Sequence, residues 1–316
     1  MQINWEKKGL IFKCENRSFF KSHTTRPIPI LLGDTIRLFL SSRDKDDMPY
    51  PTFIDVSADN PSEVLYIHEK PLFELGRTGT FDDSGITPVS ILVEESRRLM
   101  YYVGWKRRRY GVTIEPSIGV ATINESFSEA ERLFEGPILG QNPDHPLFTA
   151  APFVVRWNHS YFMWYCSGTD WINTEHGPEM VYTIFQAVSD DGLNWKQLSG
   201  DPAIPYKFDG EVVSAPWVVK LDGKFLMWYS TRGSATKKDK NFDIGLAESF
   251  DGISWLRKDQ HAGITRSNDG WDSQMICYPA VINYQDKTYM FYSGNGSGRG
   301  GIGYAVSNQQ IEIKNW

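Results

Sequence analysis

The sequence predicts an all-β fold built from five copies of one antiparallel unit. Five times, an aliphatic stretch that opens on a proline runs into a polar turn and then an aromatic stretch. The prolines stand at positions 27, 88, 152, 216 and 279, so the pattern returns every 61 to 64 residues. This repeat, the period-2 alternation within each copy and the scarcity of helix signals are the observations behind the prediction.

The first two strands of each copy can be read directly. The units are RPIPILLGDTIRLFLSS, TPVSILVEESRRLMYYVG, APFVVRWNHSYFMWYCSG, APWVVKLDGKFLMWYST and YPAVINYQDKTYMFYSG. Apolar and aromatic residues alternate on either side of a Gly, Asp or Asn turn in most of them, which is typical of a β-hairpin.

Two further strands complete the unit. A third strand follows in IGVATI, FQAVS, IGLAES and IGYAVS, and a fourth follows the turns SDDGLNW and SFDGISW. Four strands per unit at this period predict a five-bladed β-propeller. We expect blades that begin near residues 20, 81, 145, 209 and 272, within one domain spanning residues 1–316.

Composition sets further bounds. Aromatic residues make up 14% of the 316 residues, as expected where large rings fill the wedges between twisted sheets. The three cysteines, Cys14, Cys166 and Cys277, lie in or near strand patterns and are predicted to be buried thiols. No spacing resembles a zinc site, so we expect no metal and no cofactor. The absence of a basic start before an apolar run, and of a 20-residue apolar run, predicts a cytoplasmic protein without a membrane span.

The charges are predicted to separate between the two faces of the disc. In an up-and-down blade, the approach to the innermost strand and the loop after the second strand share one rim. A basic rim on a protein of net charge −6 would attract an anionic ligand, although these side chains could equally be unrelated and solvated. The acidity argues against nucleic acid as a partner. The basic residues assigned to the rim are His23, Arg26, Arg43, Lys106, Arg107, Arg108, Arg109, Arg232, Lys237, Lys238 and Arg299.

Two carboxylates share one register. Asp83 and Glu211 each stand five residues before a repeated proline, on blades two and four. Two carboxyl groups that face each other across the channel could flank a glycosidic bond, one protonating the leaving oxygen and the other activating water or acting as nucleophile. The alternative is that they bind backbone groups where strands begin.

Other candidates are aromatic or polar residues on the rim. Trp105 and Trp171 follow aromatic strands directly and could stack on sugar rings, or else wedge between blades. Tyr278, like Arg26, immediately precedes a repeated proline. Asp170 could hydrogen-bond sugar hydroxyl groups, and Asp144 in N-P-D-H-P (residues 142–146) could either bind substrate or be architectural. By contrast, Asp82, Asp209 and Asp272 follow an aromatic residue in several blades, and the S-x-D-G-x-x-W turns also recur, so we interpret both as architectural.

These repeats, the S-x-D-G-x-x-W turns and the F-D-D-S-G-I-T-P segment together resemble the five-bladed β-propeller glycosidases. That superfamily includes arabinanases, β-xylosidases, invertases, levansucrases and the mannoside phosphorylases and hydrolases of glycoside hydrolase family 130. The resemblance covers nearly the whole chain. Its members place an acid just before the proline of blade one, a second acid on blade two or three and a proton-donating Glu on blade four. The resemblance therefore implies Glu211 as general acid and Asp83 as second carboxylate.

Blade one departs from that pattern, because H-T-T-R-P (residues 23–27) carries no acid. Three explanations follow: a catalytic pair on other blades, phosphate held by His23, Arg26 and Arg232 in place of water and its base, or a scaffold that retains binding alone. We therefore expect a carbohydrate-active enzyme that cleaves or transfers a glycosidic bond in an anionic oligosaccharide or glycoconjugate. A phosphate-dependent phosphorylase and a non-catalytic glycan-binding propeller are the alternatives, and the sequence leaves the oligomeric state open.

Overall fold

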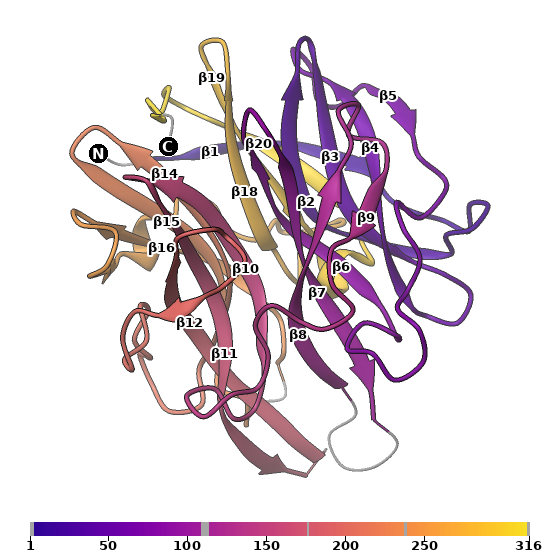
Figure 1. Cartoon of the computed structure of the whole chain (residues 1–316). Helices are drawn as coiled ribbons and strands as arrows, with labels where there is room; N and C mark the ends of the chain where they lie inside the picture. The colour runs from indigo at the N-terminus through magenta and orange to yellow at the C-terminus, as the bar shows by residue number, and fades with distance from the viewer. Residues whose placement is uncertain (1–2, 109–113, 176, 237–238, 315–316) are drawn as a thin grey trace.

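Five antiparallel sheets of four strands each form the protein, as a computed structural model shows (Figure 1). The structure describes residues 3–108, 114–175, 177–236 and 239–314, so Arg109, Lys237 and Lys238 lie outside the described residues. The innermost strand of each sheet contacts the innermost strands of its two neighbours, which closes the sheets into a ring. The predicted five-bladed β-propeller is confirmed.

The first three blades follow the chain in order, from the innermost strand outward. Blade one contains β2 (Ser22–Leu32), β3 (Thr35–Arg43), β4 (Pro49–Ser57) and β5 (Val64–Ile67). Blade two contains β6 (Ile86–Val93), β7 (Arg98–Arg107), β8 (Ile114–Ile123) and β9 (Ala130–Arg132). Blade three contains β10 (Thr149–Trp157), β11 (Ser160–Thr174), β12 (Gly177–Ser189) and β13 (Lys196–Gln197).

The last two blades close the ring. Blade four contains β14 (Val212–Leu221), β15 (Lys224–Arg232), β16 (Asp243–Ser249) and β17 (Leu256–Arg257). Blade five contains β18 (Cys277–Tyr284), β19 (Lys287–Ser293), β20 (Ile302–Ser307) and the N-terminal strand β1 (Trp5–Phe12).

The N-terminal strand supplies the outer edge of blade five. β1 pairs with β20 from Trp5 opposite Ser307 to Phe12 opposite Ile302, so the first and the last strand of the chain lie side by side (Figure 1). The C-terminal segment instead reaches blade four, where Lys314 bridges Lys220. The sequence alone does not decide which end closes the ring, because both I-N-W-E-K-K (residues 3–8) and I-E-I-K-N-W (residues 311–316) could supply the outer strand.

Aromatic side chains fill the wedges between blades. Trp164, Trp228, Tyr101 and Tyr292, all on second strands, are fully buried. The three cysteines are free and buried, as predicted. Helix is limited to η1 (Asp259–His261) and α1 (Asn295–Gly298), and no helix in the described part of the chain is long and apolar enough to cross a membrane.

The S-x-D-G-x-x-W turns are architectural, as predicted. In blade three the Asp191 carboxylate accepts the backbone N–H groups of Leu193 and Asn194, while Ser189 Oγ accepts the N–H of Gly192. The turn that begins at Ser249 in blade four repeats this arrangement. Both turns lie at the ends of third strands, on the face opposite the repeated prolines.

A β-bulge marks the repeated proline in every innermost strand. The pairing with the second strand slips at this point in all five blades. In four of them the residue before the proline has a positive φ: 57° at Arg26, 49° at Ala151, 52° at Ala215 and 58° at Tyr278. Such a conformation costs a non-glycine residue on the order of 1–3 kcal/mol, and bulges next to functional sites commonly redirect a side chain. The bulges thus position the residues at the channel mouth.

Candidate functional site

A cleft of about 290 Å³ opens where blades one, two and five meet. It lies at the N-terminal ends of the innermost strands, on the rim that the repeated prolines define. Cationic, aromatic and hydroxyl side chains line it, among them Arg26, Arg43, Arg107, Thr87, Trp105 and Tyr278. We call it the Arg26 cleft. Three residues predicted from the sequence to bind substrate, Arg26, Trp105 and Tyr278, therefore share one cavity.

Arg26 lies against an aromatic ring. Its guanidinium carbon is 4.0 Å from the centroid of the Tyr278 ring, and its backbone N–H donates to Ser293 Oγ at 3.0 Å. A cation held over a ring face gains electrostatic attraction while its N–H groups stay available at its edge. Within the described ranges no carboxylate lies within 4 Å of the Arg26 guanidinium. The side chain is therefore positioned but not neutralised.

Trp105 lines the Arg26 cleft from β7 of blade two. Its indole Nε1–H donates to Thr87 Oγ1 at 2.9 Å, and its backbone N–H donates to the Gly85 carbonyl at 2.9 Å. Gly85 has a φ of 153°, and a Cβ there would lie 2.6 Å from Cδ of Pro49 and 3.3 Å from Cδ1 of Trp105. Only glycine allows the two blades to approach so closely here.

Arg43 and Arg107 add positive charge to the same cavity. Arg43 Nη1 donates to the Asp47 carboxylate at 2.7 Å, and Arg107 Nη2 donates to the Asp47 carbonyl at 3.3 Å. Burial alone would raise the pKa of Asp47, but the hydrogen bond from Arg43 and the nearby charges, those of Arg43 and Arg107 among them, together outweigh burial and lower that pKa. Two loops on neighbouring blades are thus tied together around the cavity.

His23 lies beside this group but carries no charge near neutral pH. Its side chain is buried, and Nδ1 lies 2.8 Å from Ser22 Oγ. Burial, and then the charges of Arg43 and Arg299, lower its pKa to about 4. A contribution of His23 to ligand binding would therefore come from a neutral imidazole.

Arg232 approaches the channel mouth from blade four. Its side chain is nearly buried, its guanidinium is 5.5 Å from the Phe242 ring centroid, and Glu179 is 3.7 Å away. Its buried Nε has no hydrogen-bond partner. Burial raises the pKa of the Tyr182 hydroxyl, and Arg232 and Arg26 both oppose that rise. Both arginines therefore contribute to the electrostatic environment of Tyr182, on the third strand of blade three.

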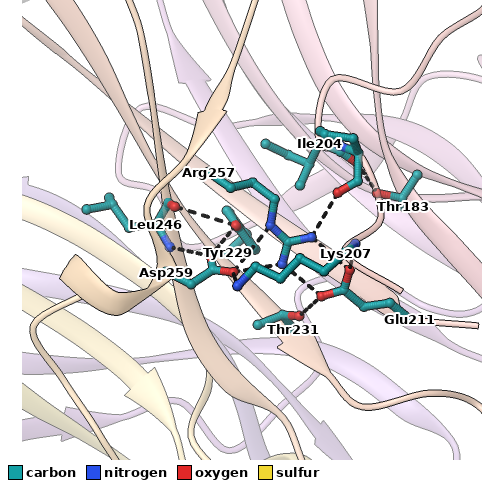
Figure 2. Close-up of polar contacts among 10 residues, drawn as sticks. Thr183, Ile204, Lys207, Glu211, Tyr229, Thr231, Leu246, Arg257 and Asp259 are labelled. Carbon is teal, nitrogen blue, oxygen red and sulfur yellow. Dashed lines mark hydrogen bonds and ion pairs between the residues drawn. The ribbon is translucent and has the colours of Figure 1, made fainter. Parts of the chain in front are cut away.

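Glu211 is enclosed within blade four (Figure 2). Only 2% of it is exposed, and it does not line the Arg26 cleft. Arg257 donates to both carboxylate oxygens, at 2.7 and 2.8 Å, and Thr231 Oγ1 and the backbone N–H of Lys207 donate at 2.9 and 2.7 Å. These four donors occupy both oxygens of the carboxylate, so Glu211 serves as the acceptor in an ion pair with Arg257.

Asp83 occupies a different environment. It is half-buried, accepts the N–H of Gly79 at 2.8 Å and the hydroxyl of Ser84 at 2.6 Å. Ser84 in turn lines the Arg26 cleft and accepts the N–H of Arg107 at 3.2 Å. Asp83 is thus one residue removed from the cleft, whereas Glu211 faces the outer strand of its own blade.

The remaining predicted site residues lie outside the Arg26 cleft. Trp171 is half-buried on the long β11 arm, where its N–H donates to Asp170 Oδ1 at 2.7 Å, and Asp170 is exposed. Asp144 is exposed in a turn in which its N–H donates to Asn142 Oδ1 at 2.9 Å. The structure does not bring these residues together with Arg26.

A repeated clamp explains why several acids are buried. In blade two, Asp82 accepts from the Tyr102 hydroxyl at 3.0 Å and from Arg132 Nε at 2.8 Å. In blade five, Asp272 accepts from the Tyr292 hydroxyl at 2.9 Å and from Lys7 Nζ at 2.6 Å. A second-strand tyrosine and an outer-strand cation thus hold an acid in each blade. The architectural role predicted for Asp82 and Asp272 is confirmed.

Blade four builds the clamp from other residues. Asp209 is exposed, and Tyr229 instead donates to Asp259, which also pairs with Arg257 at 2.8 Å. Burial would raise the pKa of Asp259, but Lys207, Tyr229 and Arg257 together lower it. Because Arg257 bridges Asp259 and Glu211, Glu211 is a member of this clamp (Figure 2). The sequence did not reveal it, since Arg257 lies 46 residues away.

Solved structures with the same fold include proteins described as glycoside hydrolases. The chain superimposes on a structure of BT0996 in an RGII complex with a TM-score of 0.75, at 17% identity over 99% of this chain and 95% of that protein. A glycosyl hydrolase from Bacteroides ovatus gives a TM-score of 0.73 at 15% identity, covering 97% of this chain and 94% of that protein. A glycoside hydrolase family 130 enzyme that targets β-1,2 mannosidic linkages in Candida mannan gives 0.66 at 16% identity, covering 97% and 94%. The resemblance to five-bladed β-propeller glycosidases is thereby confirmed for the fold.

At the level of sequence, no family model matches the chain. The uncharacterized protein Rv1502 of Mycobacterium tuberculosis strain H37Rv is 32% identical over 306 residues, covering 96% of this chain and 98% of that protein. The uncharacterized protein MT1551 of strain CDC 1551 matches to the same extent. The chain is therefore a five-bladed β-propeller that belongs to the family of the mycobacterial protein Rv1502.

Proposed function

We propose that this protein binds an anionic sugar or sugar conjugate in the Arg26 cleft and cleaves or transfers its glycosidic bond. One observation carries the proposal: the Arg26 guanidinium is fixed over Tyr278 at the channel mouth and has no described carboxylate partner. A cation prepared in this way favours a ligand that carries a carboxylate or phosphate group.

The rest of the Arg26 cleft fits a carbohydrate. Trp105 and Tyr278 offer aromatic surface on which a sugar ring can stack, and Thr87 and Ser84 offer hydroxyl groups. Arg26, Arg43 and Arg107 line the cleft together with one carboxylate, Asp47, which pairs with Arg43, so the lining keeps a net positive charge on a protein whose net charge is −6. Apolar faces and a few fixed polar groups are the usual composition of a small-molecule site.

For the chemical step, we assign acid–base work to Asp83. It adjoins the cleft through Ser84, whereas Glu211 is occupied by Arg257. With phosphate held by the arginines as the attacking group, one carboxyl group that protonates the leaving oxygen is sufficient, which favours the phosphate-dependent form of the reaction. Catalysis by Glu211 stays a prediction, and it requires that the ion pair with Arg257 open during turnover.

A non-catalytic glycan-binding propeller is the second candidate. The observation that favours it is the enclosure of Glu211, together with an arginine at the position before the blade-one proline. Both candidates require the Arg26 cleft for binding, and they differ only in whether a product forms.

The test is a panel of uronic-acid-containing oligosaccharides, sugar phosphates and matched neutral sugars, each incubated with and without phosphate. Reducing ends or sugar 1-phosphates are measured, and binding is followed by calorimetry. We expect product from an acidic substrate, loss of turnover in Asp83→Asn with binding retained, and loss of binding in Arg26→Gln. Saturable binding without product would favour the second candidate.

Arg156→Gln is the matched control, since Arg156 is an exposed arginine that pairs with Glu94 on the far face. Equal binding of acidic and neutral sugars by Arg26→Gln, Arg156→Gln and the unmodified protein would overturn the assignment of the Arg26 cleft.

A further inference from the structure

Blade four carries exposed apolar side chains that its turn does not need. In the turn from Ser249 to Trp255, Phe250 is 79% exposed and Ile253 is 45% exposed, and Leu256 on the adjoining edge strand is 58% exposed. The turn from Ser189 to Trp195 in blade three makes the same backbone hydrogen bonds with Asp190, Leu193 and Lys196 at the matching positions. In blade three, the residues that match Phe250 and Leu256 are therefore the charged Asp190 and Lys196. The apolar residues of blade four therefore require another explanation.

A cavity of matching character lies beside this turn. It measures about 370 Å³, is floored by Ile3, Leu221, Leu226 and Leu246, and is edged by Lys224, Glu248 and Lys258. The two lysines both pair with Glu248, at 3.5 and 3.8 Å, so the edge keeps one net positive charge. An apolar floor with a positive edge suits an aromatic side chain whose neighbouring residue carries a carboxylate.

Phe250 and its neighbour Asp251 have these properties. Phe250 lies two residues after Glu248 on the same face of the propeller, and Leu256 pairs with Glu248 in the sheet. Directly paired residues point to the same side of a sheet, so Leu256 lies on the side of blade four that carries the cavity. The protruding Phe250 (the knob) and the apolar cavity (the hole) thus lie near each other on one surface. In an isologous dimer, the two-fold axis lets the knob of each copy enter the hole of the other.

We propose that a second copy of this chain docks on blade four, with Phe250 of each copy inserted into the cavity floored by Leu221 and Leu246 of the other. Asp251 of one copy then approaches Lys224 and Lys258 of its partner. The interface uses the hairpin ends opposite the Arg26 cleft, because Leu221 ends β14 whereas the cleft residues precede or begin the innermost strands. Both clefts of the dimer remain open to ligand.

The experiment is analytical ultracentrifugation of the full chain with two interface variants. We expect the unmodified protein to sediment as a dimer at about 10–100 μM, and both Phe250→Asp and Leu221→Arg to raise the dissociation constant at least about 100-fold. Mixing the two variants restores dimers, because the introduced aspartate faces the introduced arginine in one contact and the native knob and hole meet in the other.

Matched controls separate the interface from folding. Asp190→Ala changes the corresponding turn of blade three and should leave the dimer intact, and thermal unfolding confirms that each variant is folded. A monomer in the unmodified protein throughout this concentration range would overturn the proposal. So would a dimer that Phe250→Asp leaves unchanged, or variants that remain monomeric when mixed.

Discussion

Arg26 and Tyr278 come from the first and the last blade, yet their side chains stack at 4.0 Å at the channel mouth. Both residues precede a repeated proline, and both have a positive φ. The same backbone bulge, repeated in two blades that ring closure brings together, therefore builds a cation over an aromatic ring. The surrounding sheets hold these two residues in their strained backbone conformation and offset its free-energy cost.

Trp105 should provide a stacking platform for a sugar ring in the Arg26 cleft. We expect Trp105→Ala to weaken binding of an acidic oligosaccharide about 10-fold, because stacking area is lost. Trp105→Phe keeps a ring face but loses the hydrogen bond to Thr87, so it should have a smaller effect. Calorimetric titration measures both. Trp171→Ala is the control outside the cleft, and an equal loss in that variant would refute a special role for Trp105.

Arg257 should be essential for stability, because it neutralises two acids at once. Removing it in Arg257→Met leaves Glu211 and Asp259 buried together without their shared cation, and we expect a loss of about 3–5 kcal/mol in the free energy of unfolding. Denaturant unfolding measures this quantity. The exposed Arg156, changed to Met, should cost less than about 1 kcal/mol.

The double variant Glu211→Gln with Arg257→Met sharpens that test. Since it also removes one of the stranded charges, it should be more stable than Arg257→Met alone. Additive losses from the two substitutions would show that Glu211 and Arg257 do not act as a pair.

Gly85 should tolerate no side chain. In Gly85→Ala the new Cβ would meet Cδ of Pro49 at 2.6 Å, so the contact between blades one and two beside Trp105 must open. We expect a loss of at least about 2 kcal/mol in unfolding free energy and weaker binding in the cleft. Gly136→Ala is the control, because nothing lies within 4 Å of its added Cβ. Equal stability of the two variants would contradict the close approach.

His23 should make the protein less stable in mild acid. Its pKa is about 4 in the folded protein, against an ordinary value of 6.5, so the unfolded chain binds the proton more readily between these pH values. Stability therefore falls as pH decreases from 6.5 towards 4 and is unaffected above 6.5. Relative to His23→Gln, the unmodified protein should lose about 2 kcal/mol between pH 7.5 and pH 5. The free energy of unfolding, measured with urea at each pH, provides the test. An equal pH dependence of this quantity in the unmodified protein and in His23→Gln would contradict the account.

The fold could be predicted because its signals are local. Period-2 alternation, the turn residues and the 61-to-64-residue spacing act within one blade, and they identify the strands and the number of blades. The repeat also places Arg26 and Tyr278 at equivalent positions, each immediately before a repeated proline. The structure brings both residues into one cavity.

The site could be predicted only in part, because its remaining contacts join residues far apart in the chain. Glu211 and Asp83 share a register, yet the direction of each side chain depends on partners that the repeat does not encode. Arg257, from the outer strand, binds Glu211, whereas Ser84 next in the chain holds Asp83. The repeat assigns Arg43 and Arg107 to the rim, but it does not reveal their contacts with Asp47, which join loops of neighbouring blades.

Binding of an acidic oligosaccharide to Arg26→Ala tests the central claim most directly. Loss of charge-assisted hydrogen bonds to the ligand should cost about 1.5–3 kcal/mol, or roughly 10- to 150-fold in affinity, while binding of the matched neutral sugar changes little. Calorimetry with both sugars, alongside the unfolding temperature of the variant, provides the measurement. An unchanged affinity for the acidic sugar in a folded Arg26→Ala protein would contradict the account.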